Sequence, residues 1–332
     1  MDRFFVNRLF DSFKDKKILI IGDVMIDAYM WGDVNRISPE APVPVVSVMQ
    51  KEYRLGGAAN VAKNIKSLDA MPIICSVVGN DESGKMFNNL LMQAGMSNEG
   101  IVMSTNRPTT VKTRVISSNQ QLLRIDEEKT AFISKEDYNN LINRMIYLLD
   151  NENIAGIIFE DYDKGVISKE LISTIVAKAK ENDIFVSVDP KRKNFNYYQN
   201  VSLFKPNLKE IKEGLNKQIT VNDKDSFVEI AYDFLIENDF DNLLVTLSEH
   251  GIFGITKDKQ YQFIPSEKRS IADVSGAGDT VISVATLCMI GGATLFDAAF
   301  ISNIAGGLVC EKVGVVPIDK AELYDEVISR IV

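Results

Sequence analysis

The 332-residue sequence predicts an α/β fold, with a mainly parallel central sheet covered by helices on both faces and a small β-sheet beside it. Short apolar runs alternate with amphipathic stretches along almost the whole chain. The runs are apolar throughout, which is typical of strands buried on both faces. Two segments, 28–50 and 109–125, have the residue pattern of extended strands, and we expect them to lie outside the main sheet. No linker or repeat divides the chain, so we expect one domain over 1–332.

The expected elements follow in chain order. Residues 1–17 place apolar side chains on one face of a surface helix, and two aspartates interrupt any signal-peptide core. Several expected helices begin with Ser or Asp, which are good N-cap residues. Strands are expected at 18–21, 73–78, 154–159, 184–188 and 243–246, and helices at 58–68, 83–94, 134–149, 168–181 and 223–237.

The stretch 280–296 carries no charge over 17 residues, a marginal length for a membrane span. Gly291 and Gly292 interrupt it, and Asp297 follows where the bilayer would still continue. We therefore expect two buried helices joined by a turn.

The charge balance excludes some partners. Asp and Glu (46) outnumber Lys and Arg (37), which gives a net charge of −9. Such a field disfavours binding to nucleic acid or to an anionic membrane surface, and we expect neither partner. An anionic substrate would need a local cationic pocket.

Cysteine and histidine are too few for several classes of site. Cys75, Cys288 and Cys310 lie far apart in apolar surroundings, so we expect buried, reduced side chains and a cytoplasmic protein. His250 is the sole histidine, which excludes zinc motifs that need two. We place it in a loop rather than in catalysis.

Residues 79–86 have the spacing of a Walker A loop, G-x4-G-K, but end in Met86. A methionine cannot ligate Mg²⁺ as Ser or Thr would, and Asp81 and Glu82 would repel phosphates. We expect a strand-to-helix turn with acidic capping.

The strongest motif is 273–280, Asp-Val-Ser-Gly-Ala-Gly-Asp-Thr, before an apolar helix. Its small residues let backbone N–H groups approach an anion at a helix N-terminus. Asp279 could then act as a general base towards a substrate hydroxyl while this turn stabilises a transferred phosphoryl group. An Asp-capped helix after a glycine-rich turn explains the same residues, so both interpretations stay open on this motif alone.

Three motifs together resemble those of the ribokinase-like (PfkB) carbohydrate kinases: the glycine pair in 56–62, Asn-x-x-Glu at 207–210, and 273–280. The resemblance covers nearly the whole chain. It implies a three-layer α/β/α sandwich with a mainly parallel central sheet and a small β-sheet lid, formed by about 28–50 and 109–125. It also implies a kinase that uses ATP and Mg²⁺.

The resemblance implies a role for each motif residue. Asp279 would be the base, and Asn207 and Glu210 would hold Mg²⁺ through water. The other implied residues are Gly276, Ala277 and Gly278 for the anion hole, Asp23, Asp27, Gly56, Gly57 and Asn60 for sugar hydroxyls, and Lys205, Thr246, Ser248, Gly251 and Asn303 for the nucleotide.

Segment 31–45 resembles the lid of one subgroup, the D-glycero-D-manno-heptose-7-phosphate kinases, and 161–165 and 189–191 resemble its substrate-side motifs. Asp161 would lie on that side. The substrate's 7-phosphate requires cations, and the candidates are Lys164 and Lys191, with Arg124 or Lys205 as further options. An adenylyltransferase domain, fused in some members, carries paired histidines, so we expect none here.

Two positions depart from the family pattern. Ser248 replaces the first glycine of the nucleotide loop, and residues 312–315 lack a threonine, which puts a monovalent-cation site in doubt.

The predicted activity is phosphorylation of the anomeric hydroxyl of D-glycero-β-D-manno-heptose 7-phosphate, on the route to ADP-heptose for lipopolysaccharide. The alternatives are another sugar or sugar phosphate, such as a fructose phosphate, ribose or a nucleoside. A non-catalytic sugar-phosphate sensor is the alternative of another class. Because such lids often pair across a two-fold axis, we also expect a homodimer.

Overall fold

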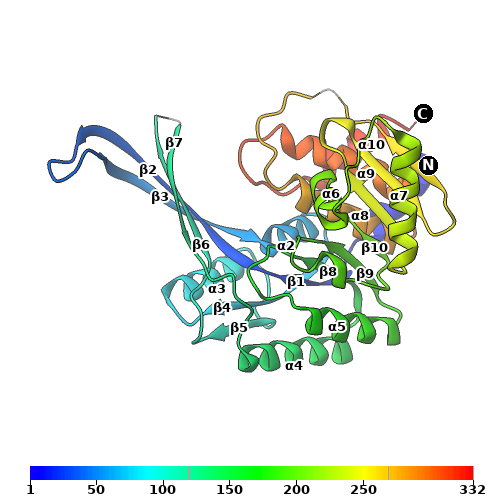
Figure 1. The fold of residues 1–332 in the computed structure, drawn as a ribbon, viewed down its shortest axis with the longest axis horizontal. Helices are drawn as coiled ribbons and strands as arrows, with labels where there is room; N and C mark the ends of the chain where they lie inside the picture. The colour runs from blue at the N-terminus through cyan, green and yellow to red at the C-terminus, as the bar shows by residue number, and fades with distance from the viewer. Residues whose placement is uncertain (119, 268, 332) are drawn as a thin grey trace.

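The computed structural model describes residues 1–118, 120–267 and 269–331, and its centre is a nine-stranded sheet (Figure 1). The strands pair in parallel, except that β12 runs antiparallel to both of its neighbours. Their order across the sheet is β13 (Tyr261–Ile264), β12 (Ile252–Thr256), β11 (Asn242–Thr246), β10 (Leu203–Phe204), β9 (Phe185–Asp189), β8 (Ile154–Glu160), β1 (Lys17–Gly22), β4 (Met71–Gly79) and β5 (Ile101–Ser104).

Helices cover both faces of this sheet, which confirms the predicted three-layer sandwich. Alternate residues of one strand enter opposite layers: Ile18 and Ile20 belong to one apolar core, and Leu19 and Ile21 to the other. Helices on the first face are α1 (Arg3–Ser12), α2 (Ala58–Ser67), α3 (Glu82–Gln93), α8 (Ala277–Ile290), α9 (Leu295–Cys310) and α10 (Lys320–Ile328). Those on the second are α4 (Lys135–Asn151), α5 (Lys169–Glu181), α6 (Leu208–Leu215) and α7 (Lys224–Glu237).

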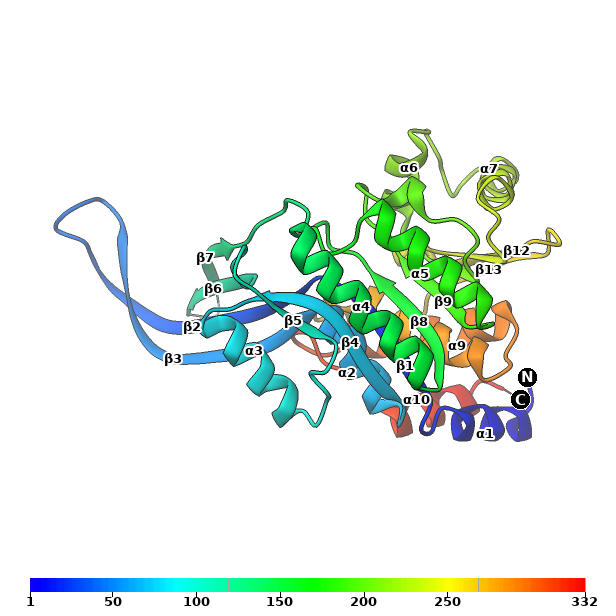
Figure 2. The same ribbon diagram turned by 90° about the horizontal axis from the view of Figure 1, so that it is seen from below.

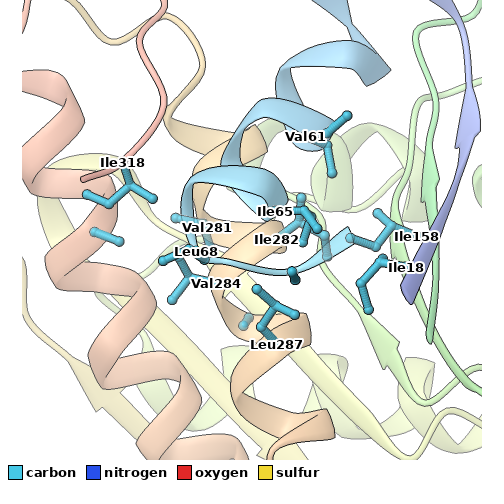
Figure 3. Close-up of a cluster of buried hydrophobic side chains, with 14 of the residues drawn as sticks. Ile18, Val61, Ile65, Leu68, Ile158, Val281, Ile282, Val284, Leu287 and Ile318 are labelled. Carbon is cyan, nitrogen blue, oxygen red and sulfur yellow. The ribbon is translucent and has the colours of Figure 1, made fainter. Parts of the chain in front are cut away.

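The first core anchors the helix that carries the strongest motif. Figure 3 shows Val281, Ile282 and Leu287 of α8 against Ile65 of α2 and Ile18 of the sheet. All five side chains are at most 4% exposed. Fully burying one such side chain contributes roughly 1.5–3 kcal/mol. The start of α8 is therefore held rigidly against the sheet.

A second sheet of four strands projects from the body (Figures 1 and 2); it contains the segments predicted to form a lid, and we call it the lid sheet, or lid. The strand order is β3 (Pro44–Gly57), β2 (Val24–Ile37), β6 (Val111–Ser117) and β7 (Gln120–Glu127). The first pair of strands exceeds the predicted segment 28–50 at both ends, because the pairing continues down to the central sheet, whereas the second pair begins at Val111 and extends past 109–125 only to Glu127. Along the chain, only Asp23 separates β1 of the central sheet from β2, the first strand of the lid.

Two local predictions are confirmed. The Asp81 carboxylate accepts a hydrogen bond from the Gly84 backbone N–H and caps α3, so residues 79–86 form a strand-to-helix turn. Residues 280–296 lie in two helices with a turn between them. Across the described residues, no helix combines the length and apolar character needed to cross a bilayer.

The cysteine prediction is correct for two residues only. Cys75 and Cys288 are free and buried, whereas Cys310 is free but partly exposed, because it lies at the last position of α9.

Candidate active site

The polar residues of the site follow the carboxyl ends of neighbouring parallel strands. Asp23 comes directly after β1, Glu160 and Asp189 end β8 and β9, and Lys205 follows β10. Parallel strands bring their carboxyl ends to one edge of the sheet, which is where open α/β sheets bind ligands. The start of α8 approaches the same edge, since a Cβ added at Gly278 would lie 3.6 Å from the Asp189 carboxylate.

Asp279 lies in the first turn of α8 and is 6% exposed. The Tyr162 hydroxyl donates a 3.0 Å hydrogen bond to Oδ1, while Oδ2 is buried without a partner among the described residues. Burial and the charge of Asp189 raise the pKa of Asp279 to about 6, although Tyr162, Lys205 and Asn60 favour the charged form. A carboxylate with a free, basic oxygen at a helix N-terminus is suited to proton abstraction.

Three carboxylates share this region. One oxygen from each of Glu160, Asp189 and Asp279 lies within 4.8 Å of the others, and each residue has a buried oxygen that lacks a hydrogen-bond partner in the described structure. Burial and the two neighbouring charges raise the pKa of Glu160 well above its ordinary value. Since Mg²⁺ prefers carboxylate oxygens, these residues fit a divalent cation.

The residues predicted to hold Mg²⁺ have other partners. The Asn207 side chain accepts the Glu210 backbone N–H at 2.8 Å, and the Glu210 carboxylate accepts the Asn207 N–H at 2.8 Å. This capping box begins α6. Glu210 also pairs with Lys191, so its charge is engaged within the protein.

Two lysines balance part of the negative charge. Lys205 is 1% exposed and its Nζ lies 2.7 Å from Asp189 Oδ2. Lys191 pairs with Glu210, and its Nζ lies 3.7 Å from Asp189 Oδ1. Burial opposes the charge of Lys191, but the carboxylates of Asp189, Glu210 and Glu160 raise its pKa. Lys191, a candidate for the substrate's phosphate, therefore lies at the carboxylate cluster, whereas Lys164 pairs with Glu128.

Asp23 holds a loop of the protein. Its carboxylate accepts the backbone N–H groups of Tyr162, Lys164 and Val166 at 3.0–3.1 Å and is 1% exposed. Asp161, also 1% exposed, accepts the Asp163 N–H and the Asn194 amide. Both carboxylates, predicted to bind substrate, fix the 161–166 loop and present little surface to a ligand.

The base of the lid supplies further polar groups and the glycine pair predicted to bind the sugar. Asp27 Oδ1 accepts a 2.7 Å hydrogen bond from Arg114, and Asn60 Oδ1 is buried without a partner in the described chain. A Cβ at Gly56 would overlap the Asp27 carboxylate, and Gly57 has a φ of +63°. The glycine pair therefore permits an approach that no larger residue allows.

Arg124 is placed differently from the other candidates. It lies on β7, the edge strand of the lid, and binds Asp126 through two hydrogen bonds of 2.8 and 2.9 Å. Its side chain is 52% exposed. No described contact joins Arg124 to the carboxylate cluster.

Lys205 lies at the carboxylate cluster, whereas the other four residues predicted to bind the nucleotide lie around the ends of β11 and β13. Thr246 ends β11, where its backbone N–H donates to Pro206 and its strand bridges to Asn207. Ser248 begins a short 3₁₀ turn that closes at Gly251. The Asn303 amide donates to the Pro265 carbonyl at 2.9 Å, which ties α9 to the end of β13.

Three residues of the site were not predicted as site residues: Glu160, Tyr162 and Asp189. Asp189 stood in a quoted motif and Glu160 directly follows an apolar run. The signal that could have found them is the convergence of parallel strand ends. Their mutual distance depends on strand order, which a single sequence does not display.

Comparison with known proteins identifies related chains. Residues 15–321 match the model of the pfkB family carbohydrate kinases. The bifunctional protein HldE of Helicobacter hepaticus is 42% identical over 301 residues, which cover 91% of this chain and 61% of that protein. HldE of Helicobacter pylori is 38% identical, over 90% and 64% of the two chains. The chain thus spans less than two thirds of these relatives.

Solved structures share the fold at low sequence identity. Phosphofructokinase-2 from Escherichia coli in complex with fructose-6-phosphate superposes with a TM-score of 0.76 at 18% identity, covering 95% of this chain and 100% of that one. Ribokinase from Arabidopsis thaliana with ribose and ATP gives 0.69 at 15% identity, covering 93% and 99%. At these identities the match establishes the architecture.

Proposed function

Because the chain belongs to the pfkB family of carbohydrate kinases, we propose that it transfers the γ-phosphoryl group of ATP to a sugar phosphate. The preferred acceptor is the C1 hydroxyl of D-glycero-β-D-manno-heptose 7-phosphate, and the product is the 1,7-bisphosphate. The observation that carries this proposal is Asp279, a buried carboxylate with one unpartnered oxygen at the start of α8.

In this reaction the acceptor hydroxyl loses its proton to Asp279 Oδ2 as its oxygen forms a bond to the γ-phosphorus. The bond from that phosphorus to the bridging oxygen of ADP breaks. Tyr162 holds the other carboxylate oxygen and so orients the base. The backbone N–H groups of Gly276 and Gly278, at the N-terminus of α8, would stabilise the developing charge, whereas the Ala277 N–H donates a 3.4 Å hydrogen bond to the Val274 carbonyl.

Glu160 and Asp189, beside the base Asp279, are the residues that would hold Mg²⁺. When bound, the ion would neutralise part of the negative charge of the phosphate groups. Lys191 and Lys205 lie against the same carboxylates and add fixed positive charge beside the transferred group.

The choice of acceptor rests on the lid. Residues 31–45 resemble the lid of heptose-7-phosphate kinases, and the match to HldE of Helicobacter hepaticus covers 91% of this chain. A product phosphorylated at C1 and C7 would serve ADP-heptose synthesis in the cytoplasm. The second candidate is the same transfer to another sugar phosphate, which the match to phosphofructokinase-2 with fructose-6-phosphate favours.

The test measures ADP release with Mg-ATP over a panel: the heptose 7-phosphate, unphosphorylated heptose, fructose phosphates, ribose and adenosine. We expect turnover with the heptose 7-phosphate above all others. In Asp279→Asn, kcat should fall roughly 10²–10⁴-fold, the usual effect of losing a general base, while ATP binding persists.

Asp297→Asn is the matched control, because Asp297 occupies the same third position of α9 that Asp279 occupies in α8. It should retain wild-type turnover. Preference for another panel member would replace the acceptor, and near-normal kcat in Asp279→Asn would remove this base from the mechanism.

We also propose that the protein is a homodimer joined through the lid. The lid exposes large apolar side chains, which a second copy would cover. Those side chains are Ile37, Val48, Met49, Leu122, Leu123 and Ile125, with exposed fractions from 43% to 70%.

A further inference from the structure

The turn that leads into α8 is held in place by the loop between α9 and α10, the α9–α10 loop. The Asp273 carboxylate accepts the Ser275 N–H at 2.9 Å within the turn and the Gly314 N–H at 3.2 Å from this loop. Val315 follows in the loop, and a Cβ added at Gly276 would lie 2.8 Å from its side chain. The position of the α9–α10 loop therefore affects the backbone N–H groups that are proposed to stabilise the transferred phosphoryl group.

One residue of the lid reaches the α9–α10 loop. Arg54 lies on β3, and a Cβ added at Gly314 would lie 3.1 Å from its Nη1 atom. Gly314 has a φ of +78°, a backbone conformation that favours glycine. The Arg54 guanidinium thus packs against the loop at the residue whose N–H is bonded to Asp273. The lid and the turn before α8 are therefore connected through Arg54 and Gly314.

Other residues of the lid orient the Arg54 side chain. Its Nε pairs with the carboxylate of Glu52 on the same strand. Its guanidinium carbon lies 4.8 Å from the centroid of the Tyr29 ring on β2, and the strand register places Asp27 directly opposite Arg54. A guanidinium that is both ion-paired and stacked has a defined direction, because its donors are planar and fixed. The lid itself therefore directs Arg54 towards Gly314.

We propose that Arg54 is a positioning residue for phosphoryl transfer. It acts through Gly314 and Asp273 on the turn that leads into α8. The backbone N–H groups of Gly276 and Gly278 are then aligned only while the lid is in place. A misplacement of about 1 Å in such a site can lower the rate roughly 10²-fold. This inference rests on the proposed kinase activity and makes one residue of the lid part of its transfer step.

The first experiment measures kcat and KM in Arg54→Met, which removes the guanidinium and keeps an unbranched side chain. With Mg-ATP and heptose 7-phosphate, kcat should fall roughly 10- to 100-fold. KM for ATP should change less than about threefold, because the alignment matters in the transition state. Arg54→Lys should recover only part of kcat, since an ammonium cannot reproduce the planar contacts. Wild-type kcat in Arg54→Met would overturn the proposal.

Lys51→Met is the matched control for a lost charge on the same strand. Lys51 is exposed on β3 and, three residues before Arg54, points to the opposite face of the sheet. It should retain wild-type kcat. An equal loss of kcat in Lys51→Met and Arg54→Met would assign the effect to the charge of the lid and overturn the positioning role.

A double variant tests the route through Gly314. Gly314→Ala adds a methyl group beside Arg54 in a strained backbone conformation, and Gly292→Ala, with a φ of +92° and no atom within 4 Å of an added Cβ, is the control for strain alone. If Arg54 acts through Gly314, the double variant should be no slower than the slower single variant. Losses in kcat that multiply would contradict this route.

Hydrogen exchange separates the positioning role from the kinase activity. Without ligands, the backbone N–H groups of 273–278 should exchange faster in Arg54→Met than in the wild type, and at the wild-type rate in Lys51→Met. If the wild type phosphorylates no sugar of the panel while this exchange depends on Arg54, the activity fails and the link between lid and turn stands. Wild-type exchange in Arg54→Met would overturn the link, whether or not the protein is active.

Discussion

At the scale of single residues, the secondary-structure position of a site residue was predictable from the sequence. Its neighbours in the folded structure were not. The 273–280 motif placed Asp279 at the start of a helix, where the structure has it. Its neighbours Glu160 and Asp189 come from two separate strands. One carboxylate oxygen from each of the three residues lies within 4.8 Å of the others, and this closeness follows from the strand order. Asp23 shows the converse, because its sequence position suits a ligand while its three backbone hydrogen bonds make it a loop anchor.

The pKa of Asp279 gives a prediction at this scale. A base must be unprotonated, and burial with the Asp189 charge raises the pKa of Asp279 to about 6. Activity should therefore fall as pH drops through 6, by about tenfold per pH unit below it. A pH profile of kcat/KM from 4.5 to 8 checks this. An acid limb centred near pH 4, or one that persists in Asp279→Asn, would assign the titration to another group.

At the scale of elements, the strands and helices that were expected are present because each carries its own pattern, whereas the short strands β5, β10, β12 and β13 and the helices α6 and α10 were not predicted. The lid strands were underestimated, since β2 and β3 continue into buried residues such as Ile26 and Leu55 that give no sign of a change of sheet. The 161–166 loop has no pattern of its own. Its conformation depends on Asp23 and Arg107, which lie far away in the sequence.

Gly165 gives a prediction for this loop. Its φ is +94°, and a Cβ there would overlap the carbonyl oxygen of Ala131. Gly165→Ala should destabilise the fold by about 1–3 kcal/mol and raise KM for the phosphorylated acceptor, because Lys164 moves with the loop. Gly292→Ala is the matched control, because Gly292 has a similar φ of +92° but a Cβ added there would have nothing within 4 Å. Thermal unfolding and acceptor kinetics on both variants provide the measurement, and equal behaviour of the pair would contradict a steric role for Gly165.

At the scale of the whole molecule, the three layers and the separate lid followed from alternation and from the two irregular segments. The way the lid projects could not be predicted, because it depends on the direction in which β2 leaves the central sheet (Figure 2). Its outer strands β3 and β7 leave unpaired edges, and its exposed leucines and isoleucine add an apolar surface.

Association through this surface predicts a dimer at micromolar concentration in sedimentation velocity. Leu123→Glu should shift the protein towards monomer, because a charge at a buried apolar contact is costly. Met92→Glu is the control, since Met92 is 56% exposed on α3, close to the 55% of Leu123 on the lid. A wild-type monomer, or equal dissociation in both variants, would rule out the lid as the interface.

The single residue between β1 and β2 has a mechanical consequence. Asp23 is the hinge from which the projecting sheet departs, and it also anchors the backbone of Tyr162 and Lys164. A shift of the projecting sheet at this point would be passed through the Asp23 carboxylate to the backbone of Tyr162, whose hydroxyl is bonded to Asp279. The position of the lid and the orientation of the base are therefore linked through one buried side chain.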